Sequence, residues 1–317
     1  MTISKTCKIY IAGHNGMVGS AIWRLLKQSG YKNLIGRNSK DLDLTNQKNV
    51  NLFFKETQPE IIIDAAARVG GILANSNYPY QFLMENLQIQ NNLIEGALKI
   101  RCKKFIFLGS SCIYPKLAPQ PIKEDFLLEG QLEKTNEYYA VAKITGVKAC
   151  QAIRKQFNLD FFSLMPTNLY GPNDNFDLKT SHVLPAMIRK FHDAMVNNNS
   201  DVKLWGTGSP MREFLHVDDL AEAVLFSIEN SLEKHIYNVG SGTDITIKTL
   251  AKKVQEVVGH KGGILWDKSK PDGTPRKVLD VSRMNNLGWK AKINLDEGIT
   301  KTYNWFKVNK LREVKFL

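Results

Sequence analysis

The chain has 317 residues, enough for a large hydrophobic core and for one or two domains. Hydrophobic residues make up 43%, no apolar run approaches the roughly 20 residues that span a membrane, and the polar start is unlike a signal peptide, so we expect a cytoplasmic protein. The formal charge of +12 comes from Lys and Arg residues that are spread along the chain, which favours a solvated basic surface over nucleic-acid binding. A polyanionic small substrate and cofactor would also suit this charge.

The first half of the chain alternates apolar runs with helical patterns. Strands are expected at residues 8–12, 61–65, 104–109 and 160–165, and helices at residues 17–28, 47–55, 82–100 and 138–157. The strands are continuous apolar runs, as in parallel sheets that are covered on both faces. This order predicts an α/β fold with a doubly wound parallel sheet of the Rossmann type.

The alternation stops after Pro166, where residues 170–180 are rich in Gly, Pro, Asn and Asp and predict a loop and a domain boundary. A strand at 213–217, a helix at 219–229 capped by Asp218 and a strand at 237–240 are assigned back to the first domain. We therefore expect a cofactor-binding domain of residues 1–170 and 213–242. A smaller substrate-binding domain would contain residues 171–212 and 243–317, with a helix over 247–258 and a loop at 270–276.

A glycine-rich loop follows the first strand and opens the first helix. It consists of Gly13, His14, Asn15, Gly16, Met17, Val18 and Gly19. Glycines at this spacing let backbone N–H groups approach a pyrophosphate at a helix N-terminus. The loop therefore predicts a dinucleotide site, with a tight turn that holds no ligand as the alternative.

The residues after the expected second strand bear on the choice of cofactor. Sites that prefer NAD usually have an acidic residue there for the ribose hydroxyls, whereas this chain has Arg37 with Lys40 close by. A guanidinium at this place can pair with a 2′-phosphate, which favours NADP. The alternative is a surface arginine.

Tyr139 and Lys143 lie four residues apart in an expected helix, so that phenol and ammonium share one face. A nearby cation should stabilise phenolate and lower the pKa of Tyr139 toward the working pH. Tyr139 could then donate a proton to a carbonyl oxygen while hydride reaches the carbon. The alternative is an amphipathic helix with an exposed charge.

The strand expected at 104–109 leads into Ser110 and Cys112, and ligands of doubly wound sheets bind beyond the carboxyl ends of strands. If the extended geometry continues, both side chains point the same way. Ser110 can then bind the carbonyl oxygen that Tyr139 serves, and nearby cations can make Cys112 a usable base. Position alone leaves an inert buried Cys112 equally open.

The other three cysteines, Cys7, Cys102 and Cys150, are interpreted as buried and inert. The four cysteines form no Cys-x-x-Cys pair and no zinc-site spacing with histidine, so reduced thiols and no metal are expected. No Asp or Glu lies between Phe105 and Lys123. A sugar dehydratase on this scaffold would need a carboxylic acid beside the serine, which argues for a different reaction.

Five further stretches are distinctive: VGGI at 69–72, GSSCIYPK at 109–116, PTNLYGP at 166–172, MREFLHVDD at 211–219 and KPDGTPRK at 270–277. Through them, from about residue 8 to 306, the chain resembles the GDP-L-fucose synthase family of the extended short-chain dehydrogenase/reductase superfamily. The resemblance implies conversion of GDP-4-keto-6-deoxy-D-mannose into GDP-L-fucose, with inversion at C3 and C5 and reduction of C4 by NADPH.

The resemblance also implies roles for individual residues. Ser110, Tyr139 and Lys143 match the reductase triad, and Cys112 and His182 match the epimerisation base and acid. Besides the glycine loop, it implies cofactor contacts at Arg37, Asp43, Leu44, Leu108, Gly109, Ser110, Ser111, Lys143, Pro166, Thr167, Asn168, Leu169 and His182. It implies contacts to the GDP-sugar at Lys190, Trp205, Arg212, Lys270 and Asp280, and a homodimer formed through helices 82–100 and 138–157.

This chemistry agrees with what the residues alone indicate. A ketone at C4 acidifies the protons on both C3 and C5, and hydrogen-bond donors such as Tyr139 and Ser110 can stabilise each enolate. The nearest rival is another nucleotide-sugar 4-epimerase or 4-reductase of the same superfamily. Cys112 and His182 discriminate against it, since a simple 4-epimerase needs only the tyrosine. A non-catalytic NADP-sensing regulator would need the glycine loop but not Tyr139 and Lys143.

Overall fold

The computed structural model describes residues 3–198, 200–270 and 272–313. Its centre is a six-stranded sheet in the order β2-β1-β3-β4-β5-β9, in which every neighbouring pair is parallel. The strands are β1 (Lys8–Ala12), β2 (Asn33–Ile35), β3 (Ile61–Asp64), β4 (Lys104–Leu108), β5 (Asp160–Pro166) and β9 (Ile236–Val239). The reversal of strand order between β1 and β3 places the end of β1 at the switch point where doubly wound sheets bind ligands.

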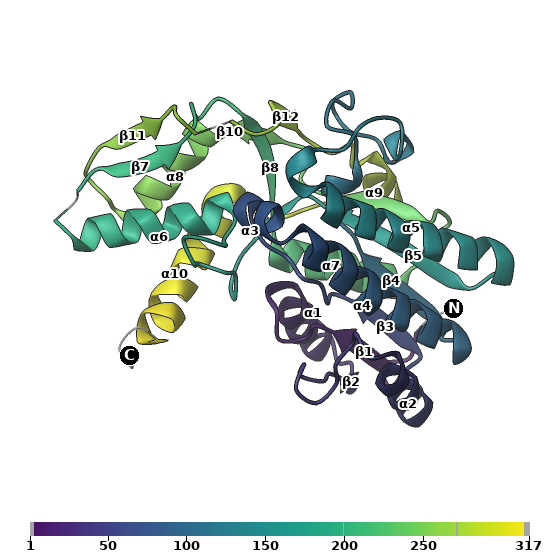
Figure 1. The fold of residues 1–317 in the computed structure, drawn as a ribbon. Coiled ribbons are helices and arrows are strands. Elements are labelled where there is room, and N and C mark those ends of the chain that lie inside the picture. The colour runs from purple at the N-terminus through teal and green to yellow at the C-terminus, as the bar shows by residue number, and fades with distance from the viewer. Residues whose placement is uncertain (1–2, 199, 271, 314–317) are drawn as a thin grey trace.

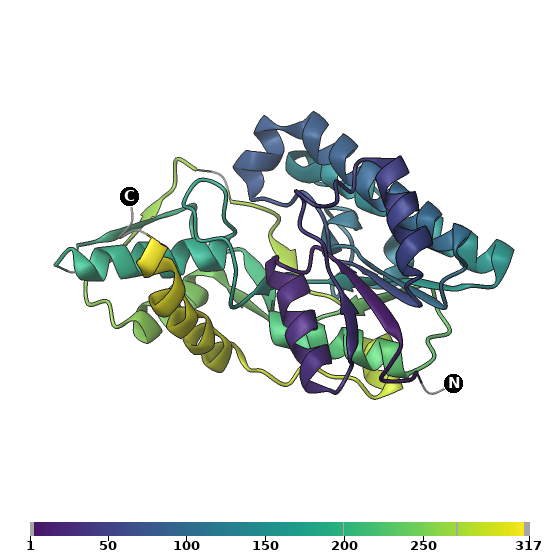
Figure 2. The same cartoon turned by 90° about the horizontal axis from the view of Figure 1, so that it is seen from below.

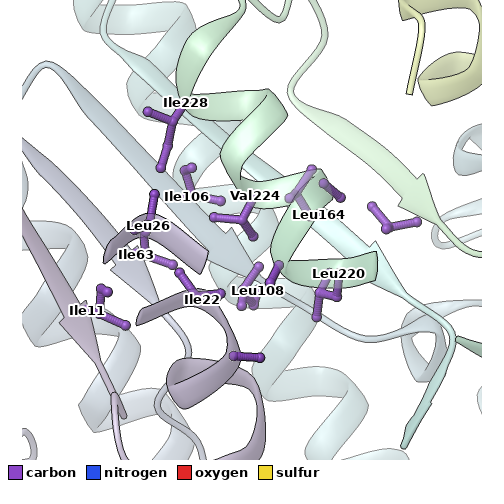
Figure 3. Close-up of a cluster of buried hydrophobic side chains, with 14 of the residues drawn as sticks. Ile11, Ile22, Leu26, Ile63, Ile106, Leu108, Leu164, Leu220, Val224 and Ile228 are labelled. Atoms are coloured by element: carbon purple, nitrogen blue, oxygen red, sulfur yellow. The ribbon is translucent and has the colours of Figure 1, made fainter. Parts of the chain in front are cut away.

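Helices cover both faces of this sheet (Figures 1 and 2). On one face lie α1 (Met17–Gln28) and α7 (Val217–Glu229), where Ile22, Leu26 and Val224 pack on Ile63 and Ile106 (Figure 3). On the other face lie α2 (Gln47–Thr57), α4 (Pro79–Lys99) and α5 (Glu137–Phe157). The central strands are apolar on both faces because both faces are covered, so the predicted fold class is confirmed.

A second unit is built around β8 (Met211–His216). This strand pairs with β10 (Asp244–Thr246) antiparallel and with β12 (Arg276–Lys277) and β6 (Asn168–Tyr170) in parallel. A separate parallel pair consists of β7 (Val202–Trp205) and β11 (Ile264–Asp267). The helices α6 (Val183–Val196), α8 (Ile247–Val258) and α10 (Leu295–Glu313) share a core with these strands.

Short elements complete the connections between the larger ones. They are α3 (Ile72–Asn77), α9 (Ser282–Leu287) and the 3₁₀ turns η1 (Ser111–Ile113), η2 (Glu124–Phe126) and η3 (Lys134–Asn136). Within the described parts of the chain, no helix is long and apolar enough to cross a bilayer.

Two local expectations are wrong. Asp218 does not cap α7: the helix begins at Val217, and the His216 side chain caps it by accepting the Asp218 N–H at 3.2 Å. The strand expected at 213–217 is β8, which begins at Met211 and belongs to the second sheet, whereas β9 joins the first. The division into two domains at the predicted boundaries stays a prediction.

Candidate active site

The glycine loop is shaped by close backbone contacts. Gly13 has φ +74°, and a Cβ there would lie 2.8 Å from the Ala65 carbonyl oxygen. A Cβ on Gly19 would lie 2.1 Å from the Gly13 carbonyl oxygen, so a side chain at either position would force the turn open. The first turn of α1 holds no acidic residue. The loop and helix N-terminus therefore fit a pyrophosphate, as the sequence predicts.

A hollow of about 480 Å³ adjoins this loop. Its lining consists of Gly13, His14, Asn15, Gly16, Arg37, Asn38, Ser39 and Lys40. The Arg37 guanidinium lies 5.4 Å from the centre of the Phe53 ring, and its Nη1 donates to the Gly36 carbonyl at 2.9 Å. Two cations and no carboxylate line this hollow, so it suits a 2′-phosphate.

Asp43 and Leu44 precede α2 and are absent from the lining of that hollow. The Asp43 Oδ1 accepts the Thr45 N–H at 2.9 Å and the Thr45 hydroxyl at 2.7 Å. The Leu44 carbonyl accepts from the Asn92 side chain at 2.8 Å. Both residues therefore order the approach to α2, and their predicted cofactor contacts stay predictions.

Tyr139 and Lys143 lie in the first two turns of α5, and Lys143 is buried. The Lys143 ammonium donates to the Leu108 carbonyl at 2.9 Å and lies 4.6 Å from the centre of the Phe107 ring. It thus joins α5 to the end of β4. Burial lowers the pKa of Lys143, and the nearby Asp64 opposes that shift.

The expected effect of Lys143 on the phenol is not found. The pKa of Tyr139 is raised, chiefly because the phenol is desolvated, and negative charge on Cys112 raises it further. A hydrogen bond from the Ser110 hydroxyl lowers this pKa. The lysine is engaged by a backbone carbonyl instead, so the phenol stays protonated in this structure.

Asp64, at the end of β3, is a residue that sequence reasoning missed. Its side chain is completely buried, its Oδ1 accepts the Ala66 N–H at 3.2 Å, and its Oδ2 has no partner among the described residues. Burial raises the pKa of Asp64 to about 6, although Lys143 opposes the shift. The sequence does contain a sign of this residue, because Asp64 is a carboxylate at the end of the otherwise apolar strand β3.

Ser110 and Cys112 both lie near the Tyr139 phenol, but a turn brings them there and not a continued strand. The strand ends at Leu108, and the chain turns through η1, where the Ser110 Oγ accepts the Cys112 N–H at 3.2 Å. The extended geometry therefore does not continue. The turn still places Ser110 and Cys112 where both act on the Tyr139 phenol.

The Cys112 sulfur is contacted by two side chains from distant parts of the chain. The Asn136 Nδ2 lies at 3.2 Å and the Lys277 Nζ at 3.8 Å. Cys112 is half-buried, whereas Cys7, Cys102 and Cys150 are buried, as expected. Sequence reasoning missed both neighbours, because Lys277 is 165 residues away and no local pattern connects it to Cys112.

The segment Pro166–Leu169 carries the chain from the first sheet to the second. Pro166 pairs with Val239 in the first sheet, while the Asn168 Nδ2 donates to the Glu213 carbonyl at 2.8 Å. Farther along, the Asn173 Nδ2 donates to the Asn15 carbonyl at 2.8 Å. The loop after β6 therefore touches the glycine loop directly.

His182 is the N-cap residue of α6 and is exposed to solvent. Protein atoms around the ring still disfavour its charged form and lower its pKa. The Gly71 N–H donates to the Thr180 carbonyl at 2.9 Å, and α3 packs against η3, which ends at Asn136. The loop that bears His182 is thereby held beside the elements at the start of α5.

Four of the five predicted substrate residues belong to the second unit, namely Lys190, Trp205, Arg212 and Lys270. The Lys270 ammonium lies 5.6 Å from the centre of the half-exposed Trp205 ring, and the Lys190 Nζ donates to the Lys203 carbonyl at 3.0 Å. Arg212 interacts with Cys112, Glu133 and Asp272, and burial lowers its pKa. The structure does not bring Asp280 to this group: its Oδ1 accepts the Ser282 N–H at 2.9 Å before α9.

Comparison with known proteins places this geometry in a family. The family model described as "NAD dependent epimerase/dehydratase family" matches residues 9–240. The chain belongs to this family. Within the NAD dependent epimerase/dehydratase family, the chain is 55% identical to "Probable GDP-L-fucose synthase 1" of Oryza sativa subsp. japonica, over 95% of this chain and 92% of that protein.

Two more members of the family extend the comparison. The "GDP-L-fucose synthase" of Escherichia coli (strain K12) is 50% identical over 96% of this chain and 98% of its own. A crystal structure of a "gdp-l-fucose synthetase from Naegleria fowleri bound to NADP" superposes with a TM-score of 0.91 at 28% identity, covering 98% of this chain and 96% of that chain. The match therefore extends over the six-stranded sheet and the second unit.

Proposed function

We propose that this chain converts GDP-4-keto-6-deoxy-D-mannose into GDP-L-fucose, inverting C3 and C5 and reducing C4 with NADPH. The observation that carries the proposal is the meeting of Ser110, Tyr139 and Cys112 at the end of β4, with Lys143 fixed on the Leu108 carbonyl. Identities of 50% and 55% to GDP-L-fucose synthases over nearly the whole chain support the same reaction.

The glycine loop, Arg37 and Lys143 would hold the cofactor. Backbone N–H groups at the N-terminus of α1 would bind its pyrophosphate, and Arg37 with Lys40 would pair with its 2′-phosphate. Residues 108–111 and 166–169 lie at and just after the carboxyl ends of β4 and β5, where they would contact the cofactor. When bound, NADPH supplies the hydride for C4.

The side chains at the end of β4 handle the protons. The Cys112 thiolate removes a proton from C3 or C5, and the electron pair of the broken C–H bond moves to the C4 oxygen. Tyr139 and Ser110 donate hydrogen bonds to that oxygen and stabilise the enolate. His182 returns a proton to the opposite face of the carbon. After both inversions, Tyr139 protonates the C4 oxygen as the ketone is reduced.

Arg212, Trp205, Lys190 and Lys270 would hold the GDP group. The Arg212 guanidinium can pair with the diphosphate, and the half-exposed Trp205 ring, with Lys270 beside it, offers a face to the base. Asp280 is left out of this set, because its Oδ1 accepts the Ser282 N–H before α9. The charge of +12 suits a substrate and a cofactor that are both polyanions.

A homodimer through α4 and α5 and a cytoplasmic location complete the proposal. Exposed apolar side chains gather on and beside these helices, namely Tyr78, Tyr80, Tyr138 and Val141. Exposed apolar surface of this kind is typical of an association surface. The four free cysteines agree with a reducing compartment.

The test is the identity of the product. The purified enzyme is given GDP-4-keto-6-deoxy-D-mannose and NADPH, consumption of NADPH is followed by absorbance, and the sugar nucleotide is identified by NMR. The proposal predicts the L-fuco configuration at C3, C4 and C5. A 4-reduced product that keeps the original configuration at C3 and C5 would reveal a simple 4-reductase instead.

A further inference from the structure

Two side chains that contact the Cys112 sulfur have no role in the proposed reaction so far. Asn136, at the N-terminus of α5, places its Nδ2 at 3.2 Å, and Lys277, in β12, places its Nζ at 3.8 Å. These residues come from different elements than Cys112 itself, which lies in η1. The sulfur therefore meets an amide donor and a cation that tertiary structure alone brings together.

The Asn136 side chain does not make the contact that is usual for asparagine at a helix N-cap. Asn at a helix N-cap usually accepts a backbone N–H with its side-chain oxygen. Asn136 makes no such cap, and its Oδ1 is buried without a partner among the described residues. The amide instead directs its N–H group to sulfur, an orientation that suits an anionic sulfur as the acceptor.

The charges around Cys112 make Lys277 distinct from its neighbours. Arg212 also interacts with Cys112, but Glu133 and Asp272 face Arg212 as well. The adjacent Arg276 pairs with Asp244 at 2.7 Å. Within the described residues no carboxylate lies within ion-pair distance of Lys277, so its charge is directed to the sulfur.

We propose that Asn136 and Lys277 are positioning residues that hold the Cys112 sulfur in place and favour its thiolate. The inference deepens the proposed function and rests on it, because Cys112 is there the base for C3 and C5. Another titratable group that faces the sulfur is the Tyr139 phenol, whose pKa is raised chiefly by burial and further by negative charge on Cys112. A charge on sulfur thus keeps the phenol protonated, so one base and one acid are present together.

Each inversion removes one proton from the carbon and returns one proton to it. The sulfur electron pair forms an S–H bond as the C–H bond breaks, and the freed pair moves toward the C4 oxygen. His182, whose charged form is disfavoured at rest, takes up a proton from solvent for this step, gives it to the opposite face of the carbon and becomes neutral again. Solvent carries the proton from Cys112 back to His182 before the second inversion, and Asn136 and Lys277 stabilise the thiolate that results.

The test is the rate at which iodoacetamide alkylates Cys112 in the full-length chain with NADPH, followed by mass spectrometry across a pH series. Only the thiolate reacts, and the other three cysteines are buried, so the signal reports on Cys112. Lys277→Met should slow alkylation near neutral pH by roughly tenfold, as loss of a charge about 4 Å away implies. Lys277→Arg should restore much of the rate.

Asn136→Asp separates positioning from helix capping. Aspartate caps a helix as well as asparagine, so a slower alkylation of this variant cannot come from loss of a helix N-cap. The proposal predicts a rate reduced by roughly tenfold, because a carboxylate would repel the thiolate. Lys268→Met, at an exposed position of the same lobe, is the control and should alkylate like the unmodified enzyme.

Alkylation of Lys277→Met and Asn136→Asp at the unmodified rate would overturn this inference, whatever the product contains. The proposed function fails on a different result, namely a product of the unmodified enzyme without solvent deuterium at C3 and C5. Both variants should also slow that incorporation more than they slow hydride transfer. Thermal unfolding of each variant identifies any that fail to fold, and either substitution alone suffices for the test.

Discussion

At the scale of single residues, the central feature is the protonated Tyr139 beside Ser110 and Cys112. Burial and the negative charge of Cys112 raise the pKa of the phenol, and the Ser110 hydroxyl opposes this. Such a phenol donates a hydrogen bond without itself ionising, as an oxyanion site requires. The structure thus places a protonated phenol beside the Cys112 thiol.

Replacing Tyr139 with Phe removes this donor while the ring keeps its packing against Phe82. We expect kcat for NADPH oxidation to fall by roughly 10²–10⁴-fold, the usual contribution of a positioned acid, with NADPH affinity retained. Tyr138→Phe is the matched control, since Tyr138 is the neighbouring and half-exposed tyrosine. Steady-state rates and fluorescence titration with NADPH measure both. Near-normal turnover of Tyr139→Phe would remove the tyrosine from the mechanism.

Asp174 gives a prediction about pH at the same scale. Burial raises its pKa to about 7, and its Oδ2 has no partner within the described residues. Because the folded pKa exceeds the unfolded one, the stability contributed by protonation is complete below about pH 4 and is lost as the pH rises to about 7. Asp174→Asn should therefore raise the free energy of unfolding above that range, by up to about 4 kcal/mol for a shift from 3.8 to about 7.

Urea unfolding of Asp174→Asn at several pH values checks this. The difference from the unmodified protein should vanish in acid and grow toward neutral pH. Asp177→Asn, in the same loop, should behave oppositely, because the Thr180 hydroxyl bonds Asp177 and lowers its pKa. A pH-independent effect of Asp174→Asn would mean that its carboxyl does not titrate as described.

At the scale of elements, β4 and α7 are joined by a buried lysine. The Lys104 Nζ donates to the carbonyls of Ser227, Ile228 and Asn230 at 2.6, 3.2 and 2.9 Å. These carbonyls lie at the end of α7, where the helix itself supplies no partners. The ammonium therefore caps the helix that packs against the strand leading to the active site.

Lys104→Met should remove this cap and leave buried carbonyls without donors. We expect the free energy of unfolding to fall by about 3 kcal/mol, measured by urea denaturation. Lys103→Met is the control: its side chain is 67% exposed and its ion pair within the described residues is with Glu60, so little change is expected. Equal stability of the two variants would contradict the proposed role of Lys104.

Sequence reasoning succeeded where chemistry is local. Gly13 and Gly19 are needed by a turn of a few residues, and the apolar runs of the sheet are continuous because both faces are covered. It failed where the tertiary structure decides. The Lys143 ammonium donates to the Leu108 carbonyl, and the 3₁₀ turn η1 follows β4 where an extended chain was expected. Lys277, which is 165 residues away in the chain, contacts the Cys112 sulfur. None of these contacts leaves a periodic pattern.

At the scale of the whole molecule, the site combines parts of both sheets. The first sheet supplies the glycine loop and the end of β4, and the second supplies Arg212 and Lys277. The Asn173 side chain joins the two by its bond to the Asn15 carbonyl. One enolisable ketone held at this junction can meet the Cys112 base, the Tyr139 acid and the reduced cofactor without leaving the enzyme.

The most direct measurement is the reaction in D₂O with GDP-4-keto-6-deoxy-D-mannose and NADPH, followed by NMR of the product. The account predicts solvent deuterium at C3 and C5 and cofactor-derived hydrogen at C4. Cys112→Ser should abolish deuterium at both carbons while NADPH still binds. Full incorporation at C3 and C5 by Cys112→Ser would contradict the account, because the protons would then be removed by a group other than the thiol.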